Sequence, residues 1–524
     1  MNSFLQSSSF PYIPLLLAIP FVGSFLVAVI PEAQKNIARW IGVAVSLVVL
    51  GLTIAMGAAF STTAGGYQFV TNHSWASSLG ISWFTGVDGI SLFLVGLTAL
   101  IVPIALLGAN EHRKTKAYVA WMLLLETACI GSFVSLDLVL FFLFFELTLI
   151  PSYFLIVGWG GQRRAAAATK FFIYTFAGSA FLLVGILFVA YLHQQQTGVF
   201  TFNLIDLMNT HYSGTAGVLL LAAFTVAFAI KAPLFPFHTW SPDTYGESPA
   251  GVAMVLSAVL AKLGAYGMIR FDLALFPHAI KVAAPVLLTL ATIGILYGAL
   301  VACGQNDLKR LVAYSSLAQM GFIILGTFAL STQGLEGAVF LMLSHGIITA
   351  AFFLVIGMIA QRRGTSDIRQ LRGLQGPAPV LAAVFTVVMM ASIGLPGLAG
   401  FVGEYLVLIG TFLTHQWWAV VATLGVVVAA IYLLWAYQRS FQGKAEGENA
   451  KVRDLTYPER LVIAPLIILI VVLGVFPKPF LDRMTPSVER TLDYITLATC
   501  PPHHTCLPTS AGQHVGVINQ GGGK

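Results

Sequence analysis

Charged side chains are scarce in this 524-residue sequence, in which Asp, Glu, Lys and Arg together make up 9% of all residues. Soluble domains carry about 25% charged residues, so this composition excludes a soluble globular protein. The apolar runs are long and unbroken, unlike the short alternating segments of a membrane β-barrel. Because each crossing helix needs about 20 apolar residues and 57% of the chain is hydrophobic, we expect an all-α membrane protein with many crossings.

Cysteine is also rare, with four residues and no Cys-x-x-Cys spacing. Iron–sulfur and zinc sites use closely spaced cysteines, and the sequence contains neither a dinucleotide-binding fingerprint nor a haem motif. Cys129 and Cys303 lie in or beside apolar runs and are interpreted as packing residues. Cys500 and Cys506 flank two prolines and two histidines, which leaves a disulfide bond or an adventitious metal site open. We expect no cofactor in this chain.

Apolar runs bounded by charges, Gly and Pro predict fourteen membrane spans. They are residues 11–31, 39–60, 87–108, 117–135, 138–158, 168–192, 216–236, 248–270, 282–303, 310–330, 337–360, 378–413, 417–437 and 460–477. The first run has no positively charged segment before it and no obvious cleavage site, so we interpret it as a span rather than a signal peptide.

The basic residues indicate topology rather than nucleic-acid binding. The net charge is +6, but most of the 27 Lys and Arg residues fall in short loops on the side of the first interhelical loop. Cytoplasmic loops are enriched in Lys and Arg, so we predict that this side is cytoplasmic and that both termini are external. Arg270 and Lys281 are assigned to the opposite side, while Lys231 and Lys262 fall inside spans.

Two of the predicted spans are interrupted. The seventh contains Pro233 and Pro236, and the long run 378–413 contains Gly394-Leu395-Pro396-Gly397. Interrupted helices in corresponding positions indicate inverted repeats with the functional site at the breaks. We therefore expect four regions. They are residues 1–116 with three spans, a first five-helix repeat over 117–270, a second over 271–437, and 438–524 with a cytoplasmic loop, the last span and an external tail.

Ionisable residues inside spans are functional candidates, because a charge at the centre of a membrane helix costs about 2.5–3.5 kcal/mol on insertion scales. Five such residues occur in five different spans: Glu146, Lys231, Lys262, His345 and Glu404. Burial and nearby charge control whether Lys or Glu holds a proton, and histidine suits a relay position. We predict a proton-transfer series in which moving Glu146 relative to Lys231 changes the proton affinity of Lys231, with waters held at the helix breaks.

Other ionisable residues are weaker candidates, and some residues of the series also allow a structural interpretation. Glu126 lies within a span, and His238 follows the first break, where it lines an entry or caps a half-helix. Asp88 and Asp137 fall near span ends and are interpreted as interfacial. A Glu146–Lys231 pair alone is also consistent with a structural bridge, and His345 alone with a core histidine.

Four segments together resemble the antiporter-like subunits of respiratory complex I. They are Phe144–Pro151 (FFELTLIP), Lys231–Trp240 (KAPLFPFHTW), Asp307–Ser316 (DLKRLVAYSS), and Gly394–Gly397 (GLPG) followed by Phe401–Glu404 (FVGE). The resemblance is close over about residues 85–435, and the fourteen-span layout extends it over nearly the whole chain. Glutamate at position 404, where related subunits carry lysine, is similar to the M-type (chain 4) branch of the family.

The resemblance implies roles for the buried series. Glu146 and Lys231 would be the coupling pair, Lys262 and His345 the central relay, and Glu404 the terminal residue toward the outside. The chain would then translocate protons within a complex I-type NAD(P)H (or related donor):quinone oxidoreductase, in a bacterial-type energy-transducing membrane. NAD(P)H or another donor, FMN, iron–sulfur clusters and quinone are expected in partner subunits, and the partners are other membrane-arm subunits and the lipid bilayer, with no nucleic acid.

Gln319 departs from the family pattern, which commonly has histidine at this position. Glutamine does not titrate, so the link from Lys262 to Glu404 would run through His345 and water. Three other interpretations remain open: a multisubunit cation/proton antiporter, which lysine in place of Glu404 would have favoured; an energy-converting membrane hydrogenase; and a spacer that has lost transport, supported only by Gln319.

Overall fold

The computed structural model describes residues 5–108, 114–212 and 214–500. Within them, thirteen helices are long and apolar enough to cross a membrane. Two shorter apolar helices, α17 and α18, follow each other across a break and supply one more crossing. The multi-pass all-α architecture is therefore confirmed, and these helices together match the positions of the fourteen predicted spans.

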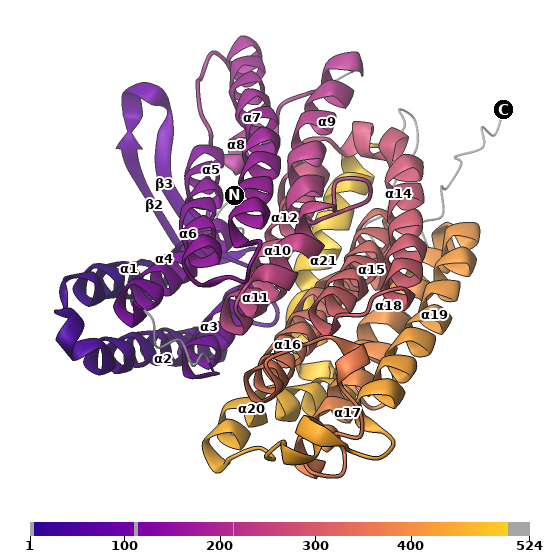
Figure 1. Ribbon diagram of the computed structural model, residues 1–524. Coiled ribbons are helices and arrows are strands. Elements are labelled where there is room, and N and C mark those ends of the chain that lie inside the picture. The colour runs from indigo at the N-terminus through magenta and orange to yellow at the C-terminus, as the bar shows by residue number, and fades with distance from the viewer. Residues whose placement is uncertain (1–4, 109–113, 213, 501–524) are drawn as a thin grey trace.

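The first half of the chain contains α1 to α10 (Figure 1). Their bounds are α1 (Tyr12–Val29), α2 (Lys35–Ala59), α3 (Ser91–Gly108), α4 (Thr115–Val134), α5 (Leu138–Leu147), α6 (Leu149–Trp159), α7 (Arg164–Thr197), α8 (Leu204–Leu207), α9 (Gly214–Lys231) and α10 (Trp240–Glu247). Helices α5 and α6 form one crossing with a kink at Thr148.

The second half begins with a crossing that contains two π-helical turns. It consists of α11 (Ala250–Val255), η3 (Leu256–Leu260), α12 (Ala261–Gly267), η4 (Met268–Asp272) and α13 (Leu273–Leu275). The remaining helices are α14 (Pro277–Cys303), α15 (Leu308–Phe328), α16 (Thr332–Arg363), α17 (Pro379–Ile393), α18 (Ala399–Thr414), α19 (Gln416–Phe441), α20 (Tyr457–Val475) and α21 (Lys478–Ala498). Short 3-10 turns are η1 (Glu32–Gln34), η2 (Ser77–Leu79), η5 (Ile368–Gln370) and η6 (Gly447–Lys451).

A small three-stranded sheet adds to the helices and was not predicted. Strand β1 (Leu5–Gln6) pairs in parallel with β2 (Tyr67–Ala76), which pairs antiparallel with β3 (Ile81–Val87). The β2–β3 hairpin stands at one edge of the molecule (Figure 1). Its Trp75 and Trp83 rings pack edge to face at 6.2 Å, a cross-strand contact that stabilises such ribbons.

Helix α21 was also missed, because the sequence analysis assigned this segment to an external tail. Its buried residues recur with helical spacing at Met484, Val488, Leu492 and Ile495, so one stripe of α21 packs on the bundle. Ser487 Oγ accepts from the backbone N–H of Gly89 at 2.9 Å, which fixes α21 over the start of α3. We call the side that carries the sheet and α21 the sheet face, and the opposite side the basic face.

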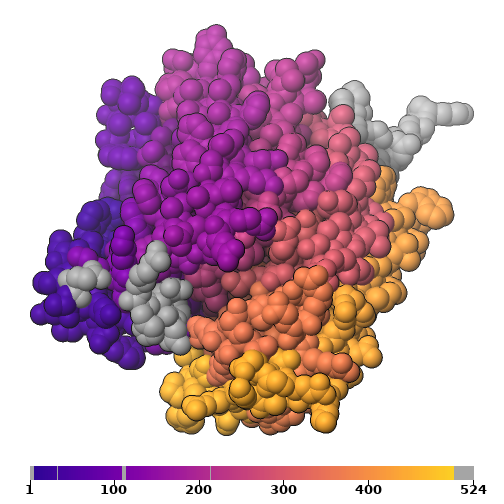
Figure 2. All heavy atoms as spheres, viewed as in Figure 1, coloured from indigo at the N-terminus to yellow at the C-terminus, as the bar shows by residue number. Residues whose placement is uncertain are grey.

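The most enclosed crossings form the centre of the bundle. The apolar windows of α11–α13 and α16 are 100% buried, and that of α15 is 94% buried, whereas that of α20 is only 22% buried. The N-terminal helices form a lobe at one edge, indigo in Figure 2, and α19 and α20 lie in the orange and yellow part of the molecule. Side chains on the central helices are therefore shielded from both water and lipid.

Two carboxyl groups that we expected at the interface are at helix starts but are buried. Asp137 caps α5 and accepts from the backbone N–H groups of Val139 and Leu140. Asp88 is fully buried and pairs with Arg270 at 2.7 Å. Arg270, which the sequence analysis placed at the end of its span, lies inside the crossing, because the crossing continues through η4 to Leu275 and encloses the guanidinium.

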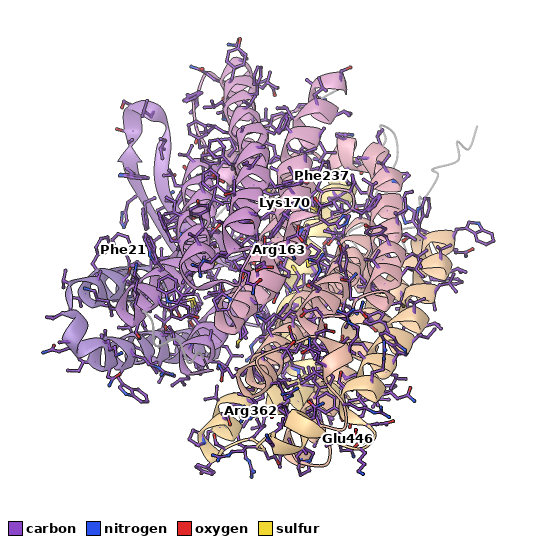
Figure 3. The ribbon with its side chains drawn as sticks, in the orientation of Figure 1. Phe21, Arg163, Lys170, Phe237, Arg362 and Glu446 are labelled. Carbon is purple, nitrogen blue, oxygen red and sulfur yellow. The ribbon has the colours of Figure 1, made fainter. Side chains whose placement is uncertain are left out.

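Ion pairs on the basic face hold the short helix α10 against its neighbours. Asp243 of α10 bonds both Lys170 of α7, at 2.8 Å, and Arg310 of α15, at 3.3 Å. Glu247 bonds Arg163 at 3.3 Å, and Arg163 and Lys170 are labelled in Figure 3. These contacts fix the segment that follows the first helix break.

Candidate functional site

The first helix break lies where the two prolines predicted it. Helix α9 ends at Lys231 and α10 begins at Trp240, because proline lacks the N–H that an α-helix requires. The indole N–H of Trp240 donates to the carbonyl oxygen of Ile230 at 2.8 Å, so the break leaves this buried carbonyl with a partner. Lys231 is thereby held at the last turn of α9, in the interior of the bundle.

Lys231 is 1% exposed and contacts the kink between α5 and α6. Its Nζ donates to Thr148 Oγ1 at 2.8 Å and lies 4.6 Å from the centre of the Phe145 ring. A hydroxyl and an aromatic face both stabilise a buried ammonium group. The structure therefore gives Lys231 a polar partner that is not Glu146.

Glu146 lies next to Phe145 and two residues before Thr148, but it bonds a different helix. Its carboxylate accepts from Ser179 Oγ of α7. Among the ion pairs of the described residues, none joins Glu146 to Lys231. The two groups of the predicted pair thus lie among α5, α7 and α9, but each bonds its own hydroxyl group. Glu146 bonds Ser179 and Lys231 bonds Thr148.

Lys262 and His345 form the centre of the site. Lys262 lies in α12 between the two π-helical turns and is fully buried. Its Nζ donates to the carbonyl oxygen of Ser257 at 2.7 Å and lies 3.0 Å from His345 Nδ1 of α16. Two proton-binding groups on different central helices are therefore in direct hydrogen-bond contact.

Close helix packing brings the first break to α12. A Cβ atom on Gly264 would overlap the carbonyl oxygen of Phe228 and stand 2.5 Å from the backbone nitrogen of Ala232. Only glycine permits this approach of two backbones. The residue after Lys231 therefore lies against the turn that carries Lys262.

The second break positions Glu404. Helix α17 ends at Ile393, α18 begins at Ala399, and Gly394 and Gly397 between them adopt φ angles of +83° and +91°. Glutamate 404 is 5% exposed, and its Oε1 accepts from Gln319 Nε2 of α15 at 2.6 Å. A Cβ atom on Gly394 would overlap Glu404 Oε2, so the break itself forms one wall of the carboxyl site.

The central and terminal groups each have one buried polar atom without a partner in the described part of the chain. Within the described residues, His345 Nε2 and Gln319 Oε1 have no hydrogen-bond partner. They belong to α16 and α15, which pack against each other. Buried polar atoms of this kind are satisfied by ordered water in proteins, so both atoms are suited to bond water.

The weaker candidates are not joined to this series. His238 packs its ring against Phe235 and Tyr297, with ring centres at 5.6 and 4.9 Å. Glu126 of α4 accepts from Ser46 Oγ of α2 at 2.7 Å. Neither bonds any of the five predicted residues among the contacts of the described chain.

Sequence reasoning missed two hydroxyl groups of the site, Thr148 and Ser179. Thr148 lies two residues after Glu146 at a kink that Pro151 causes by removing a backbone donor, and this pattern was a usable signal. Ser179 is one of several small residues on the long helix α7, and nothing in the sequence distinguishes it from the others.

The chain matches known proteins over most of its length. The family model described as NADH:quinone oxidoreductase/Mrp antiporter, TM, matches residues 135–431. NADH-quinone oxidoreductase subunit M of Mycobacterium tuberculosis is 40% identical, with 93% of this chain and 94% of that protein covered. The chain therefore belongs to the NADH:quinone oxidoreductase/Mrp antiporter family of membrane subunits.

Solved structures agree with this membership. A chain of respiratory complex I from Thermus thermophilus superposes with a TM-score of 0.84 at 32% identity, covering 92% of this chain and 99% of that one. A chain of the Mrp complex from Dietzia superposes with a TM-score of 0.82 at 23% identity, covering 93% and 98%, which shows that the fold is shared. Among the described residues, no group of three His, Cys, Asp or Glu side chains is arranged to hold a metal ion.

Cys129 and Cys303 are free thiols, in agreement with their interpretation as packing residues. Cys500 is disulfide-bonded, and Cys506 lies outside the described residues.

Proposed function

We propose that this chain is a proton-translocating membrane subunit of a complex I-type NAD(P)H (or related donor):quinone oxidoreductase. The observation that carries the proposal is the buried 3.0 Å contact between Lys262 and His345 on two central helices. A lysine and a histidine in contact exchange a proton without moving far, and no cavity for an organic substrate is needed there. The chain itself would carry no redox centre.

Proton movement would follow the order of the helices. A proton on Lys231 passes toward Lys262, because the end of α9 packs against α12 at Phe228 and Gly264. It then passes to His345 across the direct contact, and through water at His345 Nε2 and Gln319 Oε1 to Glu404. Moving one charge against 100 mV costs about 2.3 kcal/mol, so each transfer needs only a modest change in proton affinity.

Glu146 is suited to receive the driving signal. Unlike the other four residues of the series it is only partly buried, and Leu143 and Ile150 on the same helical face are 45% and 47% exposed. This face is therefore available to a neighbouring subunit. A charge arriving there shifts Glu146 between Ser179 and Lys231. The changed distance between Glu146 and Lys231 alters the proton affinity of Lys231.

Several wider assignments belong to the same proposal. Both termini lie on the external side, so the sheet face is external and the basic face is cytoplasmic. Residues 117–270 and 271–437 form the two inverted repeats, each with a broken helix as its fourth member. The electron donor, FMN, iron–sulfur clusters and quinone bind to partner subunits.

Substitution of the coupling residues tests the proposal. Lys231→Ala and Glu146→Ala should abolish or sharply reduce proton pumping coupled to quinone reduction while the chain still assembles. The matched variants are Thr148→Ser, which keeps the hydroxyl bonded to Lys231 and should pump normally, and Thr148→Val, which removes it and should pump less. Normal pumping by both alanine variants would refute the coupling assignment.

Gentle purification of the tagged native chain tests the assembly. Recovery with iron–sulfur and quinone-binding subunits supports the oxidoreductase. Recovery with small membrane partners alone would refute it and indicate a cation/proton antiporter, the function suggested by the shared fold of the Mrp complex.

A further inference from the structure

An apolar groove of about 520 Å³ lies outside the proton-transfer series. It is formed by α2, α3, α16, α20 and the first turns of α21, and α2 and α3 lie on one side of it with α16 and α20 on the other (Figure 1). Its side chains include Ile54, Phe93, Leu343, Leu473 and Phe480. With such a lining, the groove is suited to hydrocarbon and not to water.

The groove extends over about one leaflet of a bilayer. On α3 it is lined from Leu92 to Leu100, which corresponds to roughly 12 Å along a helix at 1.5 Å per residue. Half of the hydrocarbon core of a bilayer is about 15 Å. At its inner end lie Leu343 and Ile347, near the middle of the 32-residue helix α16. The groove thus begins at the sheet face and ends near the bilayer centre.

A single basic side chain, Arg483, lines the groove at its sheet-face end. The backbone at Arg483 is held close to α3, because Gly89, before α3, packs directly against the carbonyl oxygen of Arg483. One of the five N–H donors of its guanidinium bonds the carbonyl oxygen of Pro479 at 2.8 Å. A guanidinium binds phosphate in a forked geometry through donors of this kind.

We propose that this groove binds an anionic phospholipid of the leaflet on the sheet face, with an acyl chain between α3 and α16 and the phosphate on Arg483. A membrane helix from a neighbouring subunit is a poorer fit. Such a helix crosses both leaflets, and at about 10 Å wide a length of only ~7 Å would fill the volume of the groove.

The bound lipid also shields the central relay from water, an effect that rests on the proposed function. Leu343 and Ile347 in the groove wall flank His345 by two residues on either side, and a Cβ atom on Gly346 would overlap Leu97, another wall residue. The bound acyl chain therefore covers the apolar layer that separates the Lys262–His345 contact from the bilayer. This layer keeps water from reaching the central relay sideways.

Glycines in the groove allow it to be filled without disturbing the helices. A Cβ atom on Gly57 would meet no atom within 4 Å, and one on Gly96 would meet only Thr53, at 4.0 Å. Gly96→Leu and Gly57→Leu therefore place a side chain in the groove itself. Gly51→Leu is the matched control, because Gly51 also has open space around it and lies on α2 outside the groove lining.

The experiment uses the intact assembly in lipid nanodiscs that contain phosphatidylglycerol with a photoreactive group on one acyl chain. After illumination, labelled peptides are mapped by mass spectrometry, and native gels verify assembly of each variant. We expect label on the segments 92–100 and 343–347, its loss in Gly96→Leu and Gly57→Leu, and its retention in Gly51→Leu. Arg483→Gln should lower the labelling roughly fivefold, because one basic residue near anionic lipid contributes about 1 kcal/mol, whereas Lys281→Gln should leave it unchanged.

Equal labelling in the filled and control variants would overturn the site, as would cross-linking of these segments to another subunit in place of lipid. A groove that takes up phosphatidylcholine as well as phosphatidylglycerol would overturn the assignment of Arg483. None of these readouts measures proton transfer, so the lipid site and the proposed function fail separately.

Discussion

Gln319 of α15 donates a 2.6 Å hydrogen bond to Glu404 of α18. The last carboxyl group of the series is therefore held by an amide at the position where the family resemblance had led us to expect histidine. The amide fixes the orientation of Glu404 but does not itself carry a proton. Its other polar atom, Oε1, is buried and has no hydrogen-bond partner among the described residues.

The first prediction concerns this amide. Gln319→Leu removes the partner of a buried carboxyl group, a loss of about 1–3 kcal/mol, and we expect fewer protons pumped per quinone reduced. Gln319→His restores a donor that also titrates, and it should pump at least as well as the unaltered protein. Fluorescence quenching of a pH-sensitive dye in inverted membrane vesicles measures both. Full pumping by Gln319→Leu would show that the amide has no part in transfer.

The second prediction separates backbone strain from an effect on the site. Gly394 and Gly397 both have positive φ angles, so alanine at either position costs about 1–2 kcal/mol. Only the Cβ atom at 394 would overlap Glu404, whereas that at 397 would meet nothing within 4 Å. We expect Gly394→Ala and Gly397→Ala to lower thermal stability by similar amounts. Only Gly394→Ala should also reduce pumping strongly. Equal pumping by the two variants would contradict the role of Gly394 as a wall of the site.

The third prediction concerns the buried ion pair on the sheet face. Burial raises the pKa of Asp88, but Arg270 more than offsets it and holds the pKa at about 2. Because the folded pKa lies below the ordinary value near 3.9, this contribution to stability is present at neutral pH and is lost as the pH falls toward 2. Asp88→Asn leaves Arg270 buried without a counterion, which should cost about 3–5 kcal/mol at pH 7.

The measurement for this pair is the midpoint of heat-induced loss of the chain from its assembly on native gels. Asp367→Asn is the control, since Asp367 pairs with the largely exposed Arg369 and exposed pairs contribute little. We expect the difference in this midpoint between Asp88→Asn and the unaltered protein to become smaller below about pH 4. A difference that is the same at pH 7 and at low pH would exclude the ion pair as its cause.

Much of the framework was determined by the sequence itself. Low charge content and long apolar runs are sufficient to define a polytopic helical protein, because the bilayer admits few other solutions. Pro233 and Gly394 located the helix breaks, since both residues act on the backbone locally. The same reasoning found Lys262 and His345, because an ionisable residue within a span is conspicuous wherever it lies.

Only the tertiary structure decided which groups touch. Glu146 bonds Ser179 rather than Lys231, and Gln319 reaches Glu404 across 85 residues of sequence. The partner of Arg270 was hidden for the same reason, since Asp88 lies 182 residues away. Contacts of this kind depend on how each helix is rotated and where its neighbour crosses, and these are set by side-chain packing between distant segments. The sequence therefore determined which residues carry the chemistry, and the packing of the helices determined their partners.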